Sequence, residues 1–261
     1  MLVAPKGLKR RDFVVCSSQL GRLEQCPASG IYERAAKRRT NYGQWHGIFV
    51  HRFLEYTFTK GVAAALAYVR SKNMPKVIRC CEGIDLDALP KGIAELGWAH
   101  NPATDTSRQL ANHCRLRSNM DFSTEQFGRA DLVAYDGRDR ATLDGIDRPL
   151  VIDYKSGLDT ADADPGGNTQ LLGLAASLRC ELKCDKIDVA LVGVQGTGRL
   201  DWVIATLTND HLDAYVSRAR RVQLRVVADR QRADEGIAPY FAPDPEHCRW
   251  CQCKPVCPAL A

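Results

Sequence analysis

The 261-residue sequence lacks the long apolar segments that mark membrane and secreted proteins. No apolar run reaches the ~20 residues that a membrane-spanning helix needs. The basic start, MLVAPKGLKRRDF, has no apolar stretch typical of a signal peptide. Without such a signal, the 11 cysteines argue against a disulfide framework. We therefore expect a cytoplasmic protein with no membrane partner, in a compartment that keeps thiols reduced.

The sequence also lacks a Walker phosphate loop, a helicase motif, internal repeats and low-complexity tracts. These absences argue against an attached motor or repeat domain and predict a stand-alone protein. A hydrophobic content of 45% suits one globular domain over residues 1–261. Because the net charge is only +5, charge alone gives weak support for a nucleic-acid partner.

The period of the apolar residues changes along the chain. Helical spacing predicts helices within residues 44–72, and short β-rich runs predict strands from residue 127 onward. The other expected elements are a helix at 31–37, strands at 127–135, 150–155, 187–194 and 202–208, and helices at 168–178 and 210–232. Residues 73–122, which Pro75 and Pro102 interrupt, are interpreted as a helical insertion. The order predicts an α/β core with a mixed β-sheet flanked by helices.

Two of the expected strands contain three charged residues of interest. Asp131 lies in the first, and Asp153 and Lys155 end the second, where residues two apart share a face. If the strands pair, both carboxylates reach one place, and two carboxylates at one place require a cation. Lys155 could then orient an attacking water or stabilise charge on a phosphate. The alternative is a pair of strand-end aspartates beside a solvated lysine.

The cysteines suggest a second site. Cys248, Cys251 and Cys257 have C-x2-C-x5-C spacing, one ligand short of a four-thiolate site. Cys26, followed by Pro27, is the natural fourth ligand and would join the two ends of the chain. Such spacing alone does not separate an iron–sulfur cluster from zinc. Cys16 is an alternative at the N-terminal end, and Cys253 lies between the candidate ligands.

Four short motifs occur in a fixed order between the N-terminal and the C-terminal cysteines. They are Gly47-x3-His51 on a helix, Gly128-Arg129-Ala130-Asp131, Val151-Ile152-Asp153-Tyr154-Lys155, and Gln170-Leu171-Leu172. The ordered set resembles the RecB-type branch of the PD-(D/E)XK nuclease superfamily, from about residue 16 to the C-terminus without residues 73–122. The cysteine pattern resembles its iron–sulfur subset, which includes AddB-type nucleases and CRISPR-associated RecB-like exonucleases. One departure is Leu174, where the family often has tyrosine.

The resemblance implies a restriction-endonuclease-like core and a metal-dependent DNA exonuclease, with endonuclease activity as an additional option. The implied catalytic residues are Asp131, Asp153, Lys155 and Gln170, and the implied ligands of Mg²⁺ or Mn²⁺ are His51, Asp131, Asp153 and the backbone carbonyl of Tyr154. Cys26, Cys248, Cys251 and Cys257 would hold a structural 4Fe–4S cluster, with zinc as the alternative. Glu55 is either a hydrogen-bond acceptor for His51 or part of a surface ion pair.

The implied partner is DNA, single-stranded or an end-containing duplex, in DNA repair or recombination, phage DNA processing or CRISPR adaptation. A recombination or CRISPR-adaptation protein and a second copy of the chain are further expected partners. Arg218, Arg221 and Arg225 lie on the expected helix 210–232 and would contact phosphates, unless they form a solvated helix face. Lys6, Lys9, Arg10 and Arg11 form a basic tail.

Two rival functions remain open from the sequence. One is a DNA-end-binding adaptor subunit with little nuclease activity, and the other is an unrelated zinc protein with a chance D-x-K. An intact set of Asp131, Asp153 and Lys155 favours the enzyme, because a pure binding module does not need it. The zinc protein would be colourless and would show no Mg²⁺-dependent activity.

Overall fold

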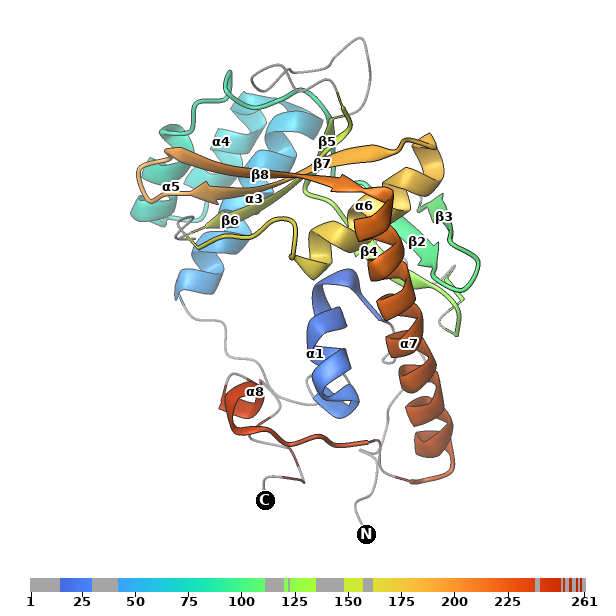
Figure 1. Cartoon of the computed structure of the whole chain (residues 1–261). Coiled ribbons are helices and arrows are strands. Elements are labelled where there is room, and N and C mark those ends of the chain that lie inside the picture. Colours follow the sequence, from blue (N-terminus) through green and yellow to red (C-terminus); the bar gives the residue numbers. More distant parts are fainter. Residues whose placement is uncertain are drawn as a thin grey trace.

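The computed structural model describes residues 15–29, 42–110, 120–121, 123–134, 148–156, 162–237, 240–249, 251, 254, 257 and 259. The expected helix at 31–37, the basic tail, Cys114 and Cys253 lie outside these residues. Within them, a five-stranded sheet has helices on both faces and a three-stranded sheet beside it (Figure 1). No helix in these ranges is long and apolar enough to cross a membrane.

The larger sheet is mixed, as the sequence predicts. Its strands, in spatial order, are β1 (Ile93–Ala94), β5 (Leu132–Ala134), β6 (Leu150–Ser156), β7 (Lys186–Val194) and β8 (Leu200–Thr208). The pair β6–β7 is parallel and the other pairs are antiparallel. A parallel pair needs a crossover connection, and helix α6 (Thr169–Leu182) lies in that connection.

Helices bury both faces of this sheet. Helices α3 (Tyr42–Lys60), α4 (Val62–Arg70) and α5 (Pro75–Glu82) share one core with Ile152 and Tyr154 of β6. Helix α6 shares the opposite core with Val151. The strand therefore alternates between the two cores, as expected for a period of two residues. This alternation turns Asp153 and Lys155 away from the core that holds Tyr154.

The prediction of a helical insertion at 73–122 is wrong for most of that range. Only α5 is helical among its described residues, and the smaller sheet, in the order β3-β2-β4, takes β2 (Gly97–Asn101) and β3 (Thr106–Gln109) from it. Its third strand is β4 (Gln126–Arg129). The turns before β2 and β3 contain Glu95 and Asp105 at positive φ (58° and 47°). Non-glycine residues are uncommon in that conformation, and neither position carries the glycine that would have indicated a left-handed turn residue.

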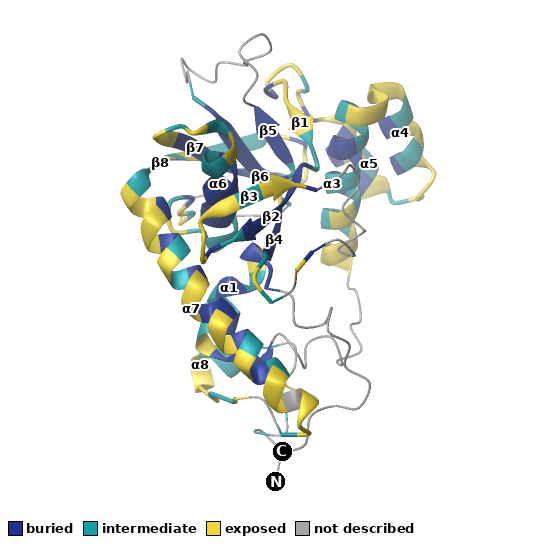
Figure 2. Cartoon of the chain, turned by 90° about the vertical axis from the view of Figure 1, so that its right-hand side faces the viewer, coloured by how far each residue is buried: buried dark blue, intermediate teal, exposed yellow. Residues whose placement is uncertain are grey.

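The long helix α7 (Asn209–Asp234) extends from the sheets toward the end of the molecule where α1 (Leu20–Gln25) and α8 (Pro245–Arg249) lie (Figure 1). In α7, the buried apolar residues recur every three or four positions, namely Leu212, Tyr215, Ala219, Val222 and Val226. Its opposite side forms an exposed stripe in Figure 2.

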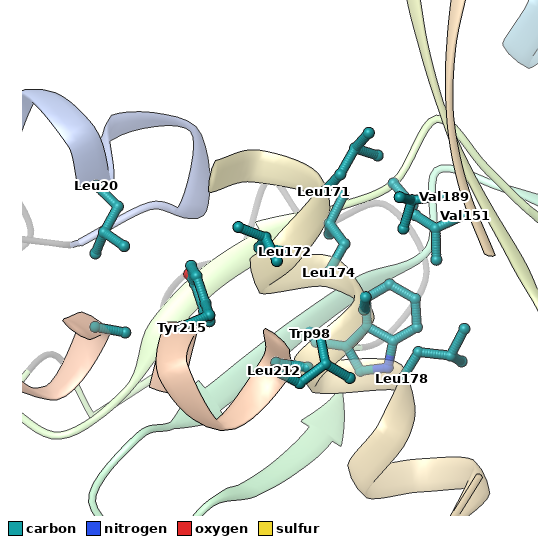
Figure 3. Packing of buried hydrophobic residues seen from close by; sticks show 14 of the residues in the cluster. Leu20, Trp98, Val151, Leu171, Leu172, Leu174, Leu178, Val189, Leu212 and Tyr215 are labelled. Atoms are coloured by element: carbon teal, nitrogen blue, oxygen red, sulfur yellow. The ribbon is translucent and has the colours of Figure 1, made fainter. Parts of the chain in front are cut away.

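Close packing around α6 fixes the parts that form the site. Figure 3 shows side chains of α1, α6 and α7 meeting those of the strands in one core. A Cβ on Gly173 would lie 2.4 Å from both Ser17 Oγ of the short helix η2 (Ser17–Gln19) and the Tyr215 hydroxyl. A Cβ on Gly128 would lie 2.9 Å from Leu174 Cδ2. These glycines allow η2, β4 and α7 to approach α6, and Leu174, the departure from the family pattern, packs directly on the motif glycine.

Candidate active site

Asp131 lies where the chain passes from one sheet to the other. The expected single strand at 127–135 is wrong, because β4 pairs with β2 while β5 pairs with β1 and β6. The Ala130 amide donates to the Leu96 carbonyl at 2.9 Å, and the Asp131 carbonyl accepts from the Glu95 amide at 3.1 Å. These bonds fix the backbone on both sides of the switch. The Asp131 side chain is consequently held at the junction of the two sheets.

The carboxylate of Asp131 has two partners. Its Oδ2 atom lies 3.3 Å from His51 Nδ1 of α3 and accepts a 2.8 Å hydrogen bond from the Tyr154 amide of β6. The pairing of β5 with β6 brings Asp131 to β6, as the sequence analysis required. The Tyr154 ring is buried on the other face, and its plane lies at 85° to the His51 ring with the ring centroids 6.5 Å apart. A metal-binding role for the Tyr154 carbonyl stays a prediction.

Asp153 is 1% exposed and is held by two side chains. Lys155 Nζ lies 2.6 Å from Asp153 Oδ2, and Gln170 Nε2 donates to Asp153 Oδ1 at 3.2 Å. Gln170 is in the first turn of α6, which begins after Asn168, whose side chain caps the amides of Gln170 and Leu171. The Asn168 cap therefore fixes the start of the helix that delivers Gln170 to the carboxylate.

Burial and the neighbouring charges give the two carboxyl groups different pKa values. Burial raises the pKa of Asp153 to about 6, and the negative charge of Asp131 adds to the rise. Burial acts on Asp131 in the same direction, but the positive charge and hydrogen bond of His51 and the Tyr154 amide outweigh it and lower its pKa. The pKa of His51 is raised, because the Asp131 carboxylate outweighs the effect of burial. The pKa of Asp153 is therefore raised and that of Asp131 lowered, as expected of two carboxyl groups that share one site.

These residues line an open cleft of about 280 Å³. His51, Asp131, Asp153, Lys155 and Gln170 all border it, although they come from two helices, a strand and a strand junction. Two carboxylates and an imidazole form a donor set that suits a hard or borderline divalent cation. The Lys155 ammonium in the same cleft suits an anionic substrate. Hydrolysis of a phosphodiester is the chemistry that this combination supports.

Other cleft residues were not identified from the sequence. Ser17 and Ser18 of η2 and Cys16 just before them also line the cleft, and the Phe127 amide donates to the Val15 carbonyl. Only the folding of the chain brings these residues to the cleft, and no sequence motif indicates it. Glu55, the alternative partner of His51, instead forms a close ion pair with Arg52.

The four candidate ligands of the second site lie together. Cys26 follows α1, Cys248 is in α8, and Cys251 and Cys257 follow it, and all four line one pocket. Burial raises the pKa of the Cys26 thiol, with the charges of Cys251 and Cys257 acting in the same direction. Cys16 belongs to the cleft instead. The pocket therefore favours Cys26 as the N-terminal thiol.

The pocket fits a thiolate-bound metal group. Apart from its cysteines it is lined mainly by apolar residues such as Phe241, Pro243 and Ala259. His247, the neighbour of Cys248, also lines it, and its buried Nε2 atom has no hydrogen-bond partner within the described part of the chain. A bound polar or metal-containing group could satisfy a ring nitrogen of this kind. The sequence analysis missed His247, although its position beside a candidate ligand was a signal.

The arginines of α7 differ in their surroundings. Arg218 forms an ion pair with Glu24 of α1, with Nη2 2.5 Å from Oε2, and Arg225 donates to the Glu24 carbonyl at 3.4 Å. Arg221 is exposed. Arg218 thus joins α7 to α1, whereas Arg221 and Arg225 are both exposed.

One further group was not expected from the sequence. His100 Nε2, an oxygen of Asp105 and Cys180 Sγ lie within 4.8 Å of one another. Arg179 also pairs with Asp105 at 2.6 Å, and Cys180 donates to the Asp105 carbonyl at 3.2 Å. These contacts tie the turn before β3 to α6. Because Arg179 occupies the carboxylate, we interpret the group as a structural network.

Comparison with known proteins agrees with this architecture. The model of the family described as the PD-(D/E)XK nuclease superfamily matches residues 15–258. A crystal structure of a protein from Eubacterium rectale, assigned provisionally as an exonuclease, matches with a TM-score of 0.51 and 9% identity. The match covers 100% of this chain and 92% of that one, and at this identity it indicates a shared fold. No curated protein matches the sequence significantly.

Proposed function

The chain belongs to the PD-(D/E)XK nuclease superfamily, and from this membership we propose that it is a metal-dependent deoxyribonuclease that removes nucleotides from DNA ends. The observation that carries the proposal is the meeting of Asp131 and Asp153 with Lys155 and Gln170 in one cleft. The negative charge of Asp131 raises the pKa of Asp153, so the two carboxylates repel each other. A bound cation would relieve this repulsion.

The donor set supports Mg²⁺ or Mn²⁺. Asp131, Asp153 and His51 would hold the ion, together with the backbone carbonyl of Tyr154. Once bound, the ion supplies a nucleophile at neutral pH and neutralises charge on the scissile phosphate.

The protein's own residues prepare the site. The Tyr154 amide holds Asp131, and the Gln170 amide holds Asp153, so both carboxylates are oriented before substrate arrives. The Lys155 ammonium lies on the cleft side of β6, where it can position the attacking water and stabilise the negative charge that develops on the phosphate. Neither step needs a covalent link between protein and DNA.

We propose further that Cys26, Cys248, Cys251 and Cys257 hold a 4Fe–4S cluster. The pocket that the four cysteines share supports this proposal, and the resemblance of their spacing to the iron–sulfur subset favours the cluster over zinc. Its role would be structural, since it joins the segment after α1 to the segment after α7. Closure of such a long loop removes conformational freedom from the unfolded chain.

The experiment that tests the function compares linear with covalently closed circular DNA, both uniformly labelled, in Mg²⁺ and in Mn²⁺. An exonuclease releases nucleotides from linear DNA and spares the circles. The adaptor alternative predicts tight binding to linear ends without release of label. Cutting of the circles at the same rate as linear DNA contradicts the requirement for ends.

A further inference from the structure

Arg129 is a cation of the cleft that the proposed mechanism does not use. It is the last residue of β4, two positions before Asp131, and it borders the same cleft as both carboxylates. Among the described residues of this cleft, Arg129 and Lys155 are the ones with a lysine or arginine side chain. The Arg129 side chain is 46% exposed, so an anion that enters the cleft can reach it.

Glu95 holds the Arg129 guanidinium on the Asp131 side of the cleft. Arg129 Nη1 lies 2.8 Å from Glu95 Oε2, and the Glu95 amide donates to the Asp131 carbonyl at 3.1 Å. Burial raises the pKa of Glu95, and the negative charge of Asp131 acts in the same direction, whereas Arg129 opposes both. Glu95 is therefore close to Arg129 and to Asp131, and it joins the guanidinium to the wall that carries the proposed metal ligand.

The backbone at Glu95 is unfavourable for a residue with a side chain. Its φ of 58° lies in the left-handed region, which non-glycine residues seldom adopt. Conformations of this kind occur most often at functional sites. A partly exposed ion pair contributes little to stability, so the contact with Arg129 does not by itself explain why the turn keeps this conformation. A role in placing the guanidinium gives a reason for it.

The ion pair leaves part of the guanidinium for a second ligand. An arginine side chain carries five N–H donors in a planar fork, and the contact with Glu95 is made through Nη1. The fork matches two oxygens of one phosphate better than the single ammonium of a lysine does. Glu95 can thus hold one part of the fork while another part faces the cleft.

A phosphate of the substrate strand is the anion that fits this position. In the proposed mechanism the metal ion and Lys155 act on the scissile phosphate, and the neighbouring phosphates of the strand are one nucleotide away on either side. A strand that is bound at the carboxylates therefore carries a second phosphate along the wall that Arg129 forms. We propose that Arg129 binds the phosphate next to the scissile one and thereby positions the strand for hydrolysis. This inference rests on the proposed nuclease function of the cleft.

The test removes the charge of one phosphate at a time. The first bond that the wild-type protein cleaves in end-labelled linear DNA is located on a gel. An uncharged methylphosphonate is then placed at each linkage near this bond, one per substrate, and single-turnover release is measured against DNA concentration. With one neighbouring linkage neutral, the wild-type protein should need about tenfold more DNA for half-maximal release, because a charge-assisted contact is lost.

Variants of Arg129 should remove this response. Arg129→Ala should need about tenfold more unmodified DNA than wild type, and no more when the same linkage is neutral, because one partner is already absent. Arg129→Lys should restore part of the affinity, since it keeps the charge without the fork.

Arg108→Ala is the matched control. Arg108 Nε lies 2.9 Å from Glu125 Oε1, and the two side chains are 45% and 14% exposed, compared with 46% and 15% for Arg129 and Glu95. Neither Arg108 nor Glu125 is among the described residues that border the cleft. The variant should respond to every neutral linkage as the wild type does.

Glu95→Gln distinguishes the guanidinium from the ion pair. The exchange removes the charge of Glu95 but keeps an oxygen that can accept from Arg129. Half-maximal release should therefore stay near the wild-type DNA concentration, and the response to the neutral linkage should persist. If Glu95→Gln weakens DNA binding as much as Arg129→Ala does, the ion pair is a structural requirement and the proposal is overturned.

Two other results also overturn it. Arg129→Ala that responds to each neutral linkage as the wild type does has lost no phosphate contact near the scissile bond. A lower maximal rate with an unchanged half-maximal DNA concentration places Arg129 on the reacting phosphate itself.

Dissociation constants for the same DNA molecules, measured in parallel, separate this proposal from the nuclease function. A wild-type protein that releases nucleotides, with an Arg129→Ala variant that responds as wild type, refutes the Arg129 contact alone. A wild-type protein that binds DNA without release refutes the nuclease, and the dissociation constants for the neutral linkages then decide on Arg129. A protein that neither binds nor releases refutes both.

Discussion

The Lys155 ammonium lies 2.6 Å from Asp153 Oδ2, two positions apart on the same side of β6. The strand period produces this contact directly, and Tyr154 between them points into the opposite core. Asp153 thereby has a cation on one oxygen and the Gln170 amide on the other. Burial still keeps its pKa well above the ordinary value, so the contacts orient the carboxylate more than they stabilise its charge.

Replacing Asp153 by asparagine should stabilise the metal-free protein above pH 6. The pKa of about 6 in the folded state exceeds the unfolded value of 3.8, so the charge is unfavourable in the fold and stability from this group is lost as pH rises from about 4 through 6. The gain at pH 8 should reach up to about 3 kcal/mol in the free energy of unfolding, and it should vanish near pH 4. Urea unfolding of both proteins in chelator measures it.

Asp188 offers a matched control for that exchange. Its carboxylate is equally buried but accepts from Arg148 at 2.9 Å and from Thr206 at 2.6 Å. Asp188→Asn should therefore destabilise the protein at pH 8, because it breaks a satisfied ion pair. Stabilisation by both exchanges, or by neither, contradicts the charge repulsion assigned to Asp153.

Lys155→Ala should slow hydrolysis roughly 10²-fold or more while metal and DNA binding stay near wild type, since the lysine acts on the reacting groups. Single-turnover rates at saturating DNA, compared with DNA dissociation constants, separate the two effects. Lys183→Ala removes a lysine from the end of α6 and should change neither quantity. Loss of DNA binding with an unchanged single-turnover rate would place Lys155 in substrate capture.

Replacement of a proposed cluster ligand should remove the colour of the protein, whereas replacement of another cysteine should not. Cys257→Ser and Cys26→Ser should bleach the brown colour of anaerobically purified protein and lower its thermal midpoint, because the ends are no longer joined. Cys16→Ser, in the catalytic cleft, and Cys253→Ser should keep the colour. A colourless wild-type protein with one zinc per chain would contradict the cluster and leave the nuclease proposal standing. Bleaching by Cys253→Ser but not by Cys257→Ser would overturn the ligand set.

Two arginines of α7 should have different roles, one in DNA binding and the other in stability. Arg221→Ala should weaken DNA binding and reduce the salt slope by about 0.9 for duplex DNA if it contacts one phosphate. Arg218→Ala should instead lower the free energy of unfolding by up to about 1 kcal/mol, because the Arg218–Glu24 pair is partly exposed. Salt-dependent binding and urea unfolding of both variants test this division. An unchanged salt slope for Arg221→Ala would assign α7 a solvated outer face.

The sequence could predict the parts of the site that local periodicity determines. Asp153 and Lys155 share a face because they are two apart in a strand. The apolar runs predicted the two strands, and their pairing, which was only a condition in the sequence analysis, brings Asp131 to them. The order of motifs added His51 and Gln170. The mixed sheet followed from the alternation of helical and strand-like segments.

Tertiary contacts determined what the sequence left out. FGRADLVAY has the composition of one strand, but it divides at Asp131 because its two halves pair with different sheets. The left-handed positions in the turns before β2 and β3 are Glu95 and Asp105, and no glycine marked them in the sequence. Ser17 and Ser18 enter the cleft only because Gly173 lets η2 approach α6.

The most direct test of the central claim is the rate of nucleotide release from linear DNA as Mg²⁺ or Mn²⁺ is added to metal-free protein, for wild type and Asp153→Ala. The account predicts no release in chelator, release that rises and saturates with the metal in wild type, and none at any metal concentration in the folded variant. Release by wild type that persists in chelator, or release by Asp153→Ala at the wild-type rate, would contradict the assignment of the Asp131–Asp153 pair as the metal centre of a nuclease.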